Sequence, residues 1–165
     1  MTTNVQETPG PIGRERVEQA ARELGLDVEI VERPAANSLE EAAELLGIEP
    51  FGIVKTIVAK RHSGDYLFVL VPGGRKISWS KLRTLLGVNK LSLPDASTAF
   101  AATGYERGTI TVLGSEQAWP VYADTTIVGR RIAVGAGEHG YSAFVDADDY
   151  LEAVGAVIAD VTDPE

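Results

Sequence analysis

Residues 51–58 read Phe-Gly-Ile-Val-Lys-Thr-Ile-Val, an apolar and β-branched run that one lysine, Lys55, interrupts. Such a run predicts a buried strand, because its isoleucines and valines place apolar side chains on both faces of the pleat. An ammonium group inside a buried strand is costly unless it meets a charged partner, a water-filled cleft or a ligand. The alternative is a lysine whose stem packs on apolar neighbours while its head group reaches solvent.

The segments on both sides of this strand predict an α+β fold. A polar turn at 60–65 and an apolar run at 66–71 indicate that the lysine strand pairs with the next run as a hairpin. Ser38 and Glu41 form a capping box for a helix that ends before Gly47. Because helices and strands alternate without regular βαβ units, the sheet should be mixed and mostly antiparallel. The other expected helices span 12–24, 80–86 with Ser80 or Ser78 as the cap, 95–102, and 150–154 with its start at Asp146 and Asp149. The other expected strands span 28–32, 90–93, 109–113, 121–124, 131–134, 141–145 and 156–159.

Length and composition are those of an ordinary globular protein. The chain has 165 residues, of which 44% are hydrophobic and 24% charged, so we expect one domain over residues 11–165 after a flexible tail at 1–10. No apolar run approaches membrane-spanning length, and the N-terminus lacks the basic and apolar regions of a signal peptide. We therefore expect no membrane contact and a cytoplasmic location.

The residue counts also limit the chemistry. The chain has no cysteine, which excludes thiolate sites. Its only two histidines, His62 and His139, do not have the spacing typical of a zinc site. The formal net charge of -9 argues against nonspecific binding of nucleic acid, DNA included, through overall charge. Residues 75–90 nevertheless hold only positive charges, and they form either a phosphate-binding patch or a solvated helix face.

Two glycine motifs stand out. Residues 135–140, Gly-Ala-Gly-Glu-His-Gly, satisfy the spacing of a dinucleotide fingerprint, but a strand and not a helix is expected after them. They fit better as a loop between two strands whose backbone approaches a ligand or turns tightly. The second motif, Gly104-x-x-x-Gly108, leads into the expected strand at 109–113. Together with Lys55, the two motifs suggest a small pocket lined by backbone and holding one cation.

These features, in this order, resemble the bacterial aminoacyl-tRNA deacylase family, which includes the Cys-tRNA(Pro) and Ala-tRNA(Pro) trans-editing proteins and the insertion editing domain of bacterial prolyl-tRNA synthetases. The similarity runs from about Val28 to Asp160. It rests on the stretches 38–48, Val54-Lys55-Thr56, 81–87, 103–108 with 113–114, and 135–137.

The resemblance implies a barrel-like sheet with surrounding helices. It also implies hydrolysis, without metal or cofactor, of the ester that joins a small mischarged amino acid, of the cysteine or alanine class, to tRNA(Pro). Lys55 would be the catalytic residue, and prolyl-tRNA synthetase is an implied partner. The substrate pocket would comprise Thr56, Gly104, Gly108, Gly135, Gly137, His139 and Ser142, and the tRNA would meet Arg75, Lys76, Lys81 and Arg83.

The chain departs from the family pattern at several positions, which bear on amino-acid specificity more than on fold. Val112 stands where the family usually has proline, Gly135 begins a loop that reads Ser-Gly-Gly in cysteine-editing members, and Ser142 follows that loop. Arg33 and Pro34 replace aromatic or histidine residues. Two alternatives to the deacylase remain: a non-catalytic module that binds charged tRNA or a synthetase, and a hydrolase of another small acyl ester or amide.

Overall fold

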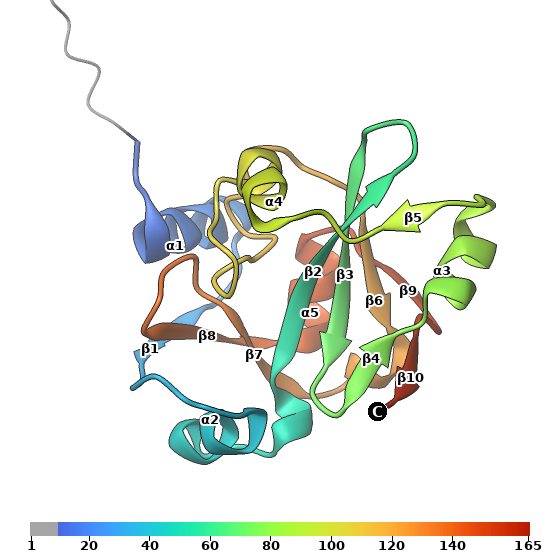
Figure 1. Ribbon diagram of the computed structural model, residues 1–165. Coiled ribbons are helices and arrows are strands. Elements are labelled where there is room, and N and C mark those ends of the chain that lie inside the picture. The colour runs from blue at the N-terminus through green and yellow to red at the C-terminus, as the bar shows by residue number, and fades with distance from the viewer. Residues whose placement is uncertain (1–9) are drawn as a thin grey trace, which may run out of the picture.

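The computed structural model describes residues 10–165, so the expected tail at 1–10 lies outside the described residues apart from Gly10. The fold is α+β, as expected (Figure 1). The helices are α1 (Gly13–Leu24), α2 (Leu39–Leu46), α3 (Trp79–Leu86), α4 (Ala96–Thr103) and α5 (Ala147–Ala153), with the 3-10 turns η1 (Pro50–Gly52) and η2 (Thr125–Ile127). The strands are β1 (Glu29–Glu32), β2 (Val54–Arg61), β3 (Tyr66–Pro72), β4 (Arg75–Ile77), β5 (Leu91–Ser92), β6 (Val121–Asp124), β7 (Arg131–Gly135), β8 (Tyr141–Asp146), β9 (Val157–Ala159) and β10 (Thr162–Pro164).

The strands form three sheets of mixed direction. The largest has the order β5-β2-β3-β6-β9, in which β2 and β3 form the expected antiparallel hairpin while β6 runs parallel to both β3 and β9. A second sheet has the antiparallel order β1-β8-β7, and a third pairs β10 with β4. The mixed α+β fold expected from the sequence is therefore confirmed.

The barrel-like closure is not confirmed, because no sheet closes on itself among residues 10–165. In the described part of the chain, backbone pairing joins the two larger sheets at one isolated bridge, between Ile53 and Ala133. The expected strand at 109–113, which could have added further pairing, is also wrong: this segment has no regular secondary structure. The glycines on either side, Gly108 and Gly114, both have positive φ, and the chain between them turns where a strand would have to run straight.

The central strand of the fold is β3, and it is buried on both faces. Phe68 and Leu70 pack into one hydrophobic core with Val54, Val58 and residues of α1, α5 and the second sheet. Leu67, Val69 and Val71 pack on the other face with Leu82 of α3 and Val161. Burial on both faces explains why the sequence of β3 is continuously apolar and does not alternate.

Helix boundaries follow local capping chemistry. The Ser38 hydroxyl accepts a hydrogen bond from the Glu41 N–H at the start of α2, and Gly47 ends that helix with φ 70°. Ser78, Asp95 and Asp146 begin α3, α4 and α5 in the same way. A side-chain oxygen at this position satisfies an N–H that has no partner within the helix, which is why these boundaries can be read from sequence.

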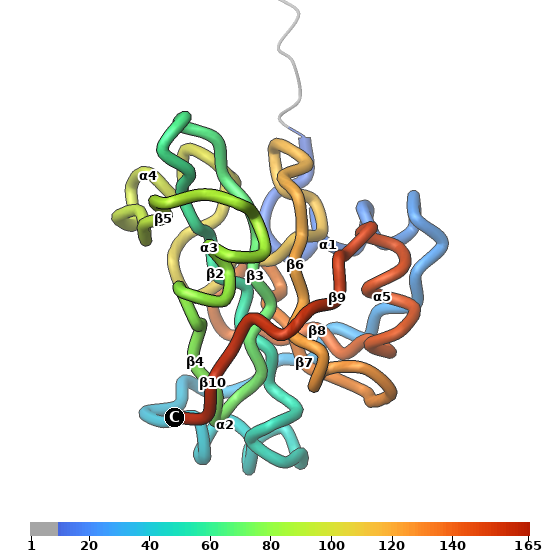
Figure 2. Tube along the Cα trace, turned by 90° about the vertical axis from the view of Figure 1, so that its right-hand side faces the viewer, coloured from blue at the N-terminus to red at the C-terminus, as the bar shows by residue number. Residues whose placement is uncertain are grey.

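The end of the chain is fastened to the molecule by β10, which the sequence did not predict. In Figure 2 the trace leaves β9 and runs beside β4 to the C-terminus. Asp124, at the end of β6, is fully buried and accepts hydrogen bonds from the N–H groups of Val161 (3.1 Å) and Thr126 (3.2 Å). Burial alone would raise the pKa of the Asp124 carboxyl, but hydrogen bonds from the Thr126 and Thr162 side chains, together with those two N–H groups, outweigh it and hold that pKa below its usual range.

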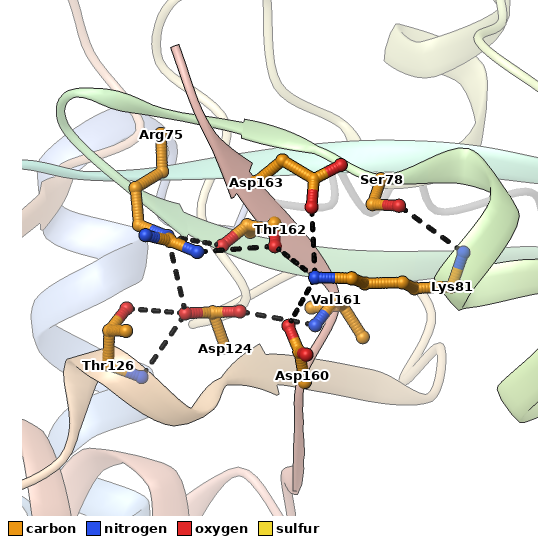
Figure 3. A network of polar contacts seen from close by, with 9 residues as sticks. All are labelled: Arg75, Ser78, Lys81, Asp124, Thr126, Asp160, Val161, Thr162 and Asp163. Atoms are coloured by element: carbon orange, nitrogen blue, oxygen red, sulfur yellow. Dashed lines mark hydrogen bonds and ion pairs between the residues drawn. The ribbon is translucent and has the colours of Figure 1, made fainter.

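Two cations complete this network (Figure 3). Arg75 donates from Nε to the Thr162 hydroxyl (2.6 Å) and lies 3.9 Å from the Asp124 carboxylate. Lys81 Nζ lies 3.0 Å from Asp160 and 2.9 Å from Asp163. Two of the cations expected to meet tRNA are therefore engaged in holding the C-terminal segment.

Candidate active site

A cavity of about 580 Å³ lies along one edge of β2. The opposite wall comes from β7, β8 and the segment after α4, and α2 and the start of α4 also supply lining residues. The lining residues fall into four groups: Arg33, Ala36, Ser38, Leu39, Ala42 and Leu46; Ile53 to Val58; Leu93, Pro94, Ala96 and Ala99; and Arg107, Gly108, Ile110, Ala133, Val134, Gly135, Tyr141 and Ser142.

The edge of β2 in this cavity carries backbone groups that no strand covers. Gly73 donates its N–H to the Ile53 carbonyl, which makes this a hydrogen-bonded pair of the antiparallel ladder. Because such pairs alternate, the N–H and C=O of Thr56 point away from β3. Strand β5 pairs only with Lys60 and Arg61, farther along β2. The Thr56 hydroxyl is also buried and has no hydrogen-bond partner within residues 10–165.

Lys55 is the next residue of interest on this strand. Its side chain is exposed and lines the cavity, and it forms no ion pair with any residue of the described chain. The cost expected for a lysine in this strand is thus relieved by solvent in a cleft and not by a carboxylate. The ammonium group remains available for a ligand.

The two glycine motifs meet on the opposite wall. A side chain on Gly135 would place its Cβ 2.4 Å from the Ile110 carbonyl oxygen, and Gly137 donates its N–H to the Thr109 carbonyl at 3.0 Å. The close backbone approach expected at the 135–140 loop is therefore an approach to the chain's own 109–110 segment. The N–H groups of Gly108 and Ile110 donate no hydrogen bond within residues 10–165, so they can serve as donors to a ligand.

This close contact gives a testable prediction. The change Gly135→Ala should push the 109–110 backbone away from β7, because the added methyl group meets backbone atoms that cannot rotate away. We expect a loss of about 1–3 kcal/mol in the free energy of unfolding. We also expect a roughly tenfold lower catalytic rate at this site, since reacting groups are sensitive to small displacements. Denaturant unfolding and activity measurements would check this.

The matched control is Gly64→Ala, in the β2–β3 turn. Gly64 has φ 93° and nothing within 4 Å of its added Cβ, so the substitution strains the backbone without moving the cavity wall. It should lower stability and leave activity unchanged. Full activity in Gly135→Ala would show that the wall tolerates the displacement.

Three of the expected pocket residues do not line the cavity. Gly104 ends α4 with φ 82°, Gly137 packs behind the wall, and His139 is exposed, with Nε2 3.1 Å from a Glu106 carboxylate oxygen. His139 does lie against Gly108, whose added Cβ would be 3.7 Å from the ring. Lys55, Thr56, Gly108, Gly135 and Ser142 are the expected residues that the structure brings together around the cavity.

Tyr105 supports the wall from within. Its side chain is buried, and its hydroxyl donates to the Leu113 carbonyl at 2.6 Å. Burial raises the pKa of Tyr105 to about 12, so the group stays neutral in the physiological range. A Cβ on Gly137 would lie 2.7 Å from the Tyr105 ring, which explains the need for glycine there. Tyr105 thereby holds the 104–110 segment and the 135–140 loop against each other.

The expected tRNA-binding residues lie apart from the cavity lining. Arg75 and Lys76 are on β4, and Lys81 and Arg83 are on α3. Hydrogen bonds to Asp163 and Asp160 raise the pKa of Lys81 above its usual value. Those two carboxylates also compensate the charge of Lys81. Arg75 faces Asp124, and the other two residues of this group, Lys76 and Arg83, form no ion pair within residues 10–165.

Two cavity residues were not expected from the motifs. Arg33 follows β1 and donates from Nε to the Ser142 hydroxyl at 3.0 Å, while Arg107 lies between the two glycines of the 104–108 motif and is exposed. The cavity thus has three cations, with Lys55, and no aspartate or glutamate in its lining. In the described part of the chain no group of three histidine, aspartate or glutamate side chains could hold a metal ion, and no helix is long and apolar enough to span a bilayer.

Comparisons with known proteins agree with one another. The family model for the aminoacyl-tRNA editing domain matches residues 33–153. The chain is 35% identical over 91 residues to a proline–tRNA ligase of Desulforamulus reducens, a match that covers 55% of this chain and 16% of the ligase. It is 29% identical over 129 residues to EbsC of Enterococcus faecalis, a candidate Cys-tRNA(Pro)/Cys-tRNA(Cys) deacylase, with 78% of this chain and 79% of EbsC covered.

The solved structures extend the likeness to the whole fold. A candidate trans-editing enzyme for prolyl-tRNA synthetase has a TM-score of 0.84 and 25% identity, with 91% of this chain and 96% of that chain covered. The chain spans only 16–17% of the length of the first proline–tRNA ligases it matches, whereas it spans most of the free-standing proteins.

Proposed function

This chain belongs to the aminoacyl-tRNA editing domain family, and we propose that it is a trans-editing deacylase. It would hydrolyse the ester between tRNA and a small mischarged amino acid of the cysteine or alanine class, with tRNA(Pro) as the carrier. The observation that carries the proposal is the cavity at the edge of β2. There Lys55, Thr56, Gly108 and Ile110 line one space, and the N–H groups of Gly108 and Ile110 have no acceptor within residues 10–165.

The chemistry requires no strong nucleophile from the protein. In the proposed reaction, a water oxygen attacks the ester carbonyl carbon and the carbonyl oxygen becomes an oxyanion. The C–O bond to the ribose then breaks, the ribose oxygen takes the proton that the attacking water gives up, and the free amino acid leaves. Backbone N–H groups fixed near the carbonyl oxygen stabilise that oxyanion without having to reorganise. The unpaired N–H groups of Gly108 and Ile110 suit this role.

Lys55 would act on the charged part of the substrate. Its ammonium group can hold the phosphate of the terminal adenosine or polarise the ester region, and either interaction fixes the ester against the backbone donors. Thr56 offers strand-edge backbone groups to the aminoacyl end or the ribose. An attacking group of the substrate itself could replace water in the same geometry.

The family also suggests where the protein works. Prolyl-tRNA synthetase is a proposed partner, because a synthetase could deliver charged tRNA to a protein whose net charge of -9 repels nucleic acid. A function in translation is consistent with a cytoplasmic location. Neither DNA nor a membrane has a part in this proposal.

The test is release of amino acid from a panel of charged tRNAs that includes Ala-tRNA(Pro) and Cys-tRNA(Pro), with purified protein and with prolyl-tRNA synthetase present or absent. Hydrolysis of one member of the panel would establish the activity and name its substrate. If no member is cleaved while charged tRNA still binds, the non-catalytic binding module becomes the better assignment. Cleavage of simple acyl esters alone would favour a different small-ester hydrolase.

The contribution of the basic patch on β4 and α3 can be measured separately. Arg83→Glu should weaken tRNA binding. If Arg83 neutralises one phosphate, the negative slope of log K against log salt should also become shallower by about one. Arg22→Glu, an exposed position in the last turn of α1, is the matched control. An unchanged affinity for Arg83→Glu would remove α3 from the tRNA-binding surface. Lys81 is a poor choice for this test, because its reversal would also disrupt the ion pairs with Asp160 and Asp163.

A further inference from the structure

The charge of the cavity contrasts with the charge of the protein. The whole chain carries a formal net charge of -9, yet the lining of the cavity contains three cations, Arg33, Lys55 and Arg107, and no aspartate or glutamate. Like charges gathered in one cleft repel one another and focus a positive potential there. This arrangement favours an anionic occupant over a neutral one.

Arg33 differs from the other two cations because the protein holds it in place. Its own N–H continues the ladder beyond β1 by donating to the Gly140 carbonyl at 2.8 Å. Its side chain donates from Nε to the Ser142 hydroxyl at 3.0 Å and from Nη1 to the Pro34 carbonyl at 3.2 Å. Ser142 lies on β8 with only 7% of its surface exposed, so the acceptor is itself fixed.

A guanidinium group has five N–H donors, and these contacts use two of them. The other three, including both on Nη2, have no acceptor within residues 10–165, although Arg33 is half-buried and lines the cavity. A fixed guanidinium with a free pair of donors matches the oxygens of a phosphate, and it loses little conformational entropy when an anion binds. Lys55 and Arg107 have no comparable hydrogen bonds to hold them in the described chain.

We propose that Arg33 is a phosphate-binding residue of the active site and that Ser142 is the positioning residue that holds it. The inference rests on the proposed function, which supplies a substrate that carries one phosphate per nucleotide. It assigns Arg33 to the 5′-phosphate of the terminal nucleoside, since the acyl groups proposed for the substrate, alanyl and cysteinyl, have no anionic oxygen.

The experiment measures binding of adenosine 5′-monophosphate and of adenosine to the full chain, by calorimetry or equilibrium dialysis. The wild type should prefer the monophosphate. Arg33→Gln should reduce that preference about tenfold by removing a charged hydrogen-bond donor, while Arg22→Gln on α1 should leave it unchanged. Arg33→Lys keeps the charge but cannot retain the Nε contact, so it should recover only part of the preference.

Ser142→Ala tests the positioning role. It should lower the preference less than Arg33→Gln does, and the double variant Arg33→Gln/Ser142→Ala should match Arg33→Gln alone, because the serine acts through the arginine. A purely structural serine would lower thermal stability in both backgrounds and leave the ratio of the two affinities unchanged. Thermal unfolding of each variant identifies any loss that comes from misfolding, and Arg33→Lys provides a second reading if Arg33→Gln is unstable.

Equal affinities of the wild type for the two probes, no binding of the monophosphate, or an unchanged ratio in Arg33→Gln would each overturn the proposal. These outcomes are independent of catalysis. A protein that binds the monophosphate through Arg33 but cleaves no charged tRNA would refute the deacylase function and leave the phosphate site in place. If the protein cleaves charged tRNA and Arg33→Gln leaves KM unchanged, the deacylase function stands and Arg33 is not a phosphate-binding residue.

Discussion

The change Lys55→Ala is expected to lower deacylation at least about 100-fold while leaving thermal unfolding nearly unchanged. Lys55 is exposed and has no ion pair within residues 10–165, so its removal breaks no interaction that holds the fold. Its side chain lines the cavity, where a cation stabilises an anionic ligand or a developing negative charge. Single-turnover hydrolysis and a melting curve would measure the two effects.

Lys60→Ala is the matched control, because Lys60 lies on the same strand and does not line the cavity. It should retain full activity. A large fall in melting temperature for Lys55→Ala would make Lys55 a structural residue, and an unchanged rate would exclude it from catalysis. Lys55→Arg separates charge from shape: partial activity would indicate a phosphate contact, which a guanidinium can also make.

The change Asp124→Asn should destabilise the protein by about 2–4 kcal/mol. Asp124 is fully buried, and its carboxylate accepts from the Val161 and Thr126 N–H groups and faces Arg75 (Figure 3). An amide in its place has one acceptor oxygen fewer, turns an NH₂ group toward donors and leaves Arg75 without its anion. Urea unfolding would measure the loss. Asp163→Asn, in an exposed ion pair with Lys81, should have little effect by comparison.

The same carboxylate predicts how stability depends on pH. The folded-state pKa of Asp124 lies below the unfolded value of about 3.9, so the unfolded chain binds the proton more readily. The stabilisation from Asp124 is therefore complete above the unfolded pKa and is lost as pH falls through the folded pKa. Below about pH 4 the wild type should lose stability more steeply than Asp124→Asn. Parallel slopes would show that another group controls acid unfolding.

Local features of the sequence predicted much of the fold. Helix starts at Ser38 and Asp146, and the helix end at Gly47, depend on a few neighbouring residues, and the structure confirms them. The hairpin of β2 and β3 was equally local, because a short polar turn separates two apolar runs. Pairing between distant segments was not predictable: β4 and β10 have three residues each and are separated by more than half the chain, with no pattern that links them.

The segment 109–113 shows why a strand pattern can mislead. Residues 109–113 read Thr-Ile-Thr-Val-Leu, a β-branched run in which polar and apolar side chains alternate, and this pattern predicts a strand. In the structure every second residue, from Thr109 to Leu113, is buried. Such a pattern indicates only that one face of the segment is buried, however. A strand also needs a neighbouring strand with which its backbone N–H and C=O groups form hydrogen bonds. Here the segment approaches β7 through the Gly135 contact and turns at glycines on both sides.

The candidate site was predictable where motifs carried it. Lys55, Thr56, Gly108, Gly135 and Ser142 were expected at the pocket and line the cavity, and their roles stay predictions until variants are tested. Arg33 could not be placed, because its position in the wall depends on the register between β1 and β8, which joins residues more than 100 positions apart. No property of the sequence around residue 33 specifies that register.

The uncovered edge of β2 has a consequence for the solubility of the protein. An open strand edge with free N–H and C=O groups is a template on which another chain can add a strand, and soluble proteins ordinarily protect such edges. Here residues of α2, α4 and β7 line the same cavity as the edge, and we expect these walls to limit the space in which a strand from a second molecule could lie alongside. Variants that loosen these walls should therefore aggregate before they lose their secondary structure.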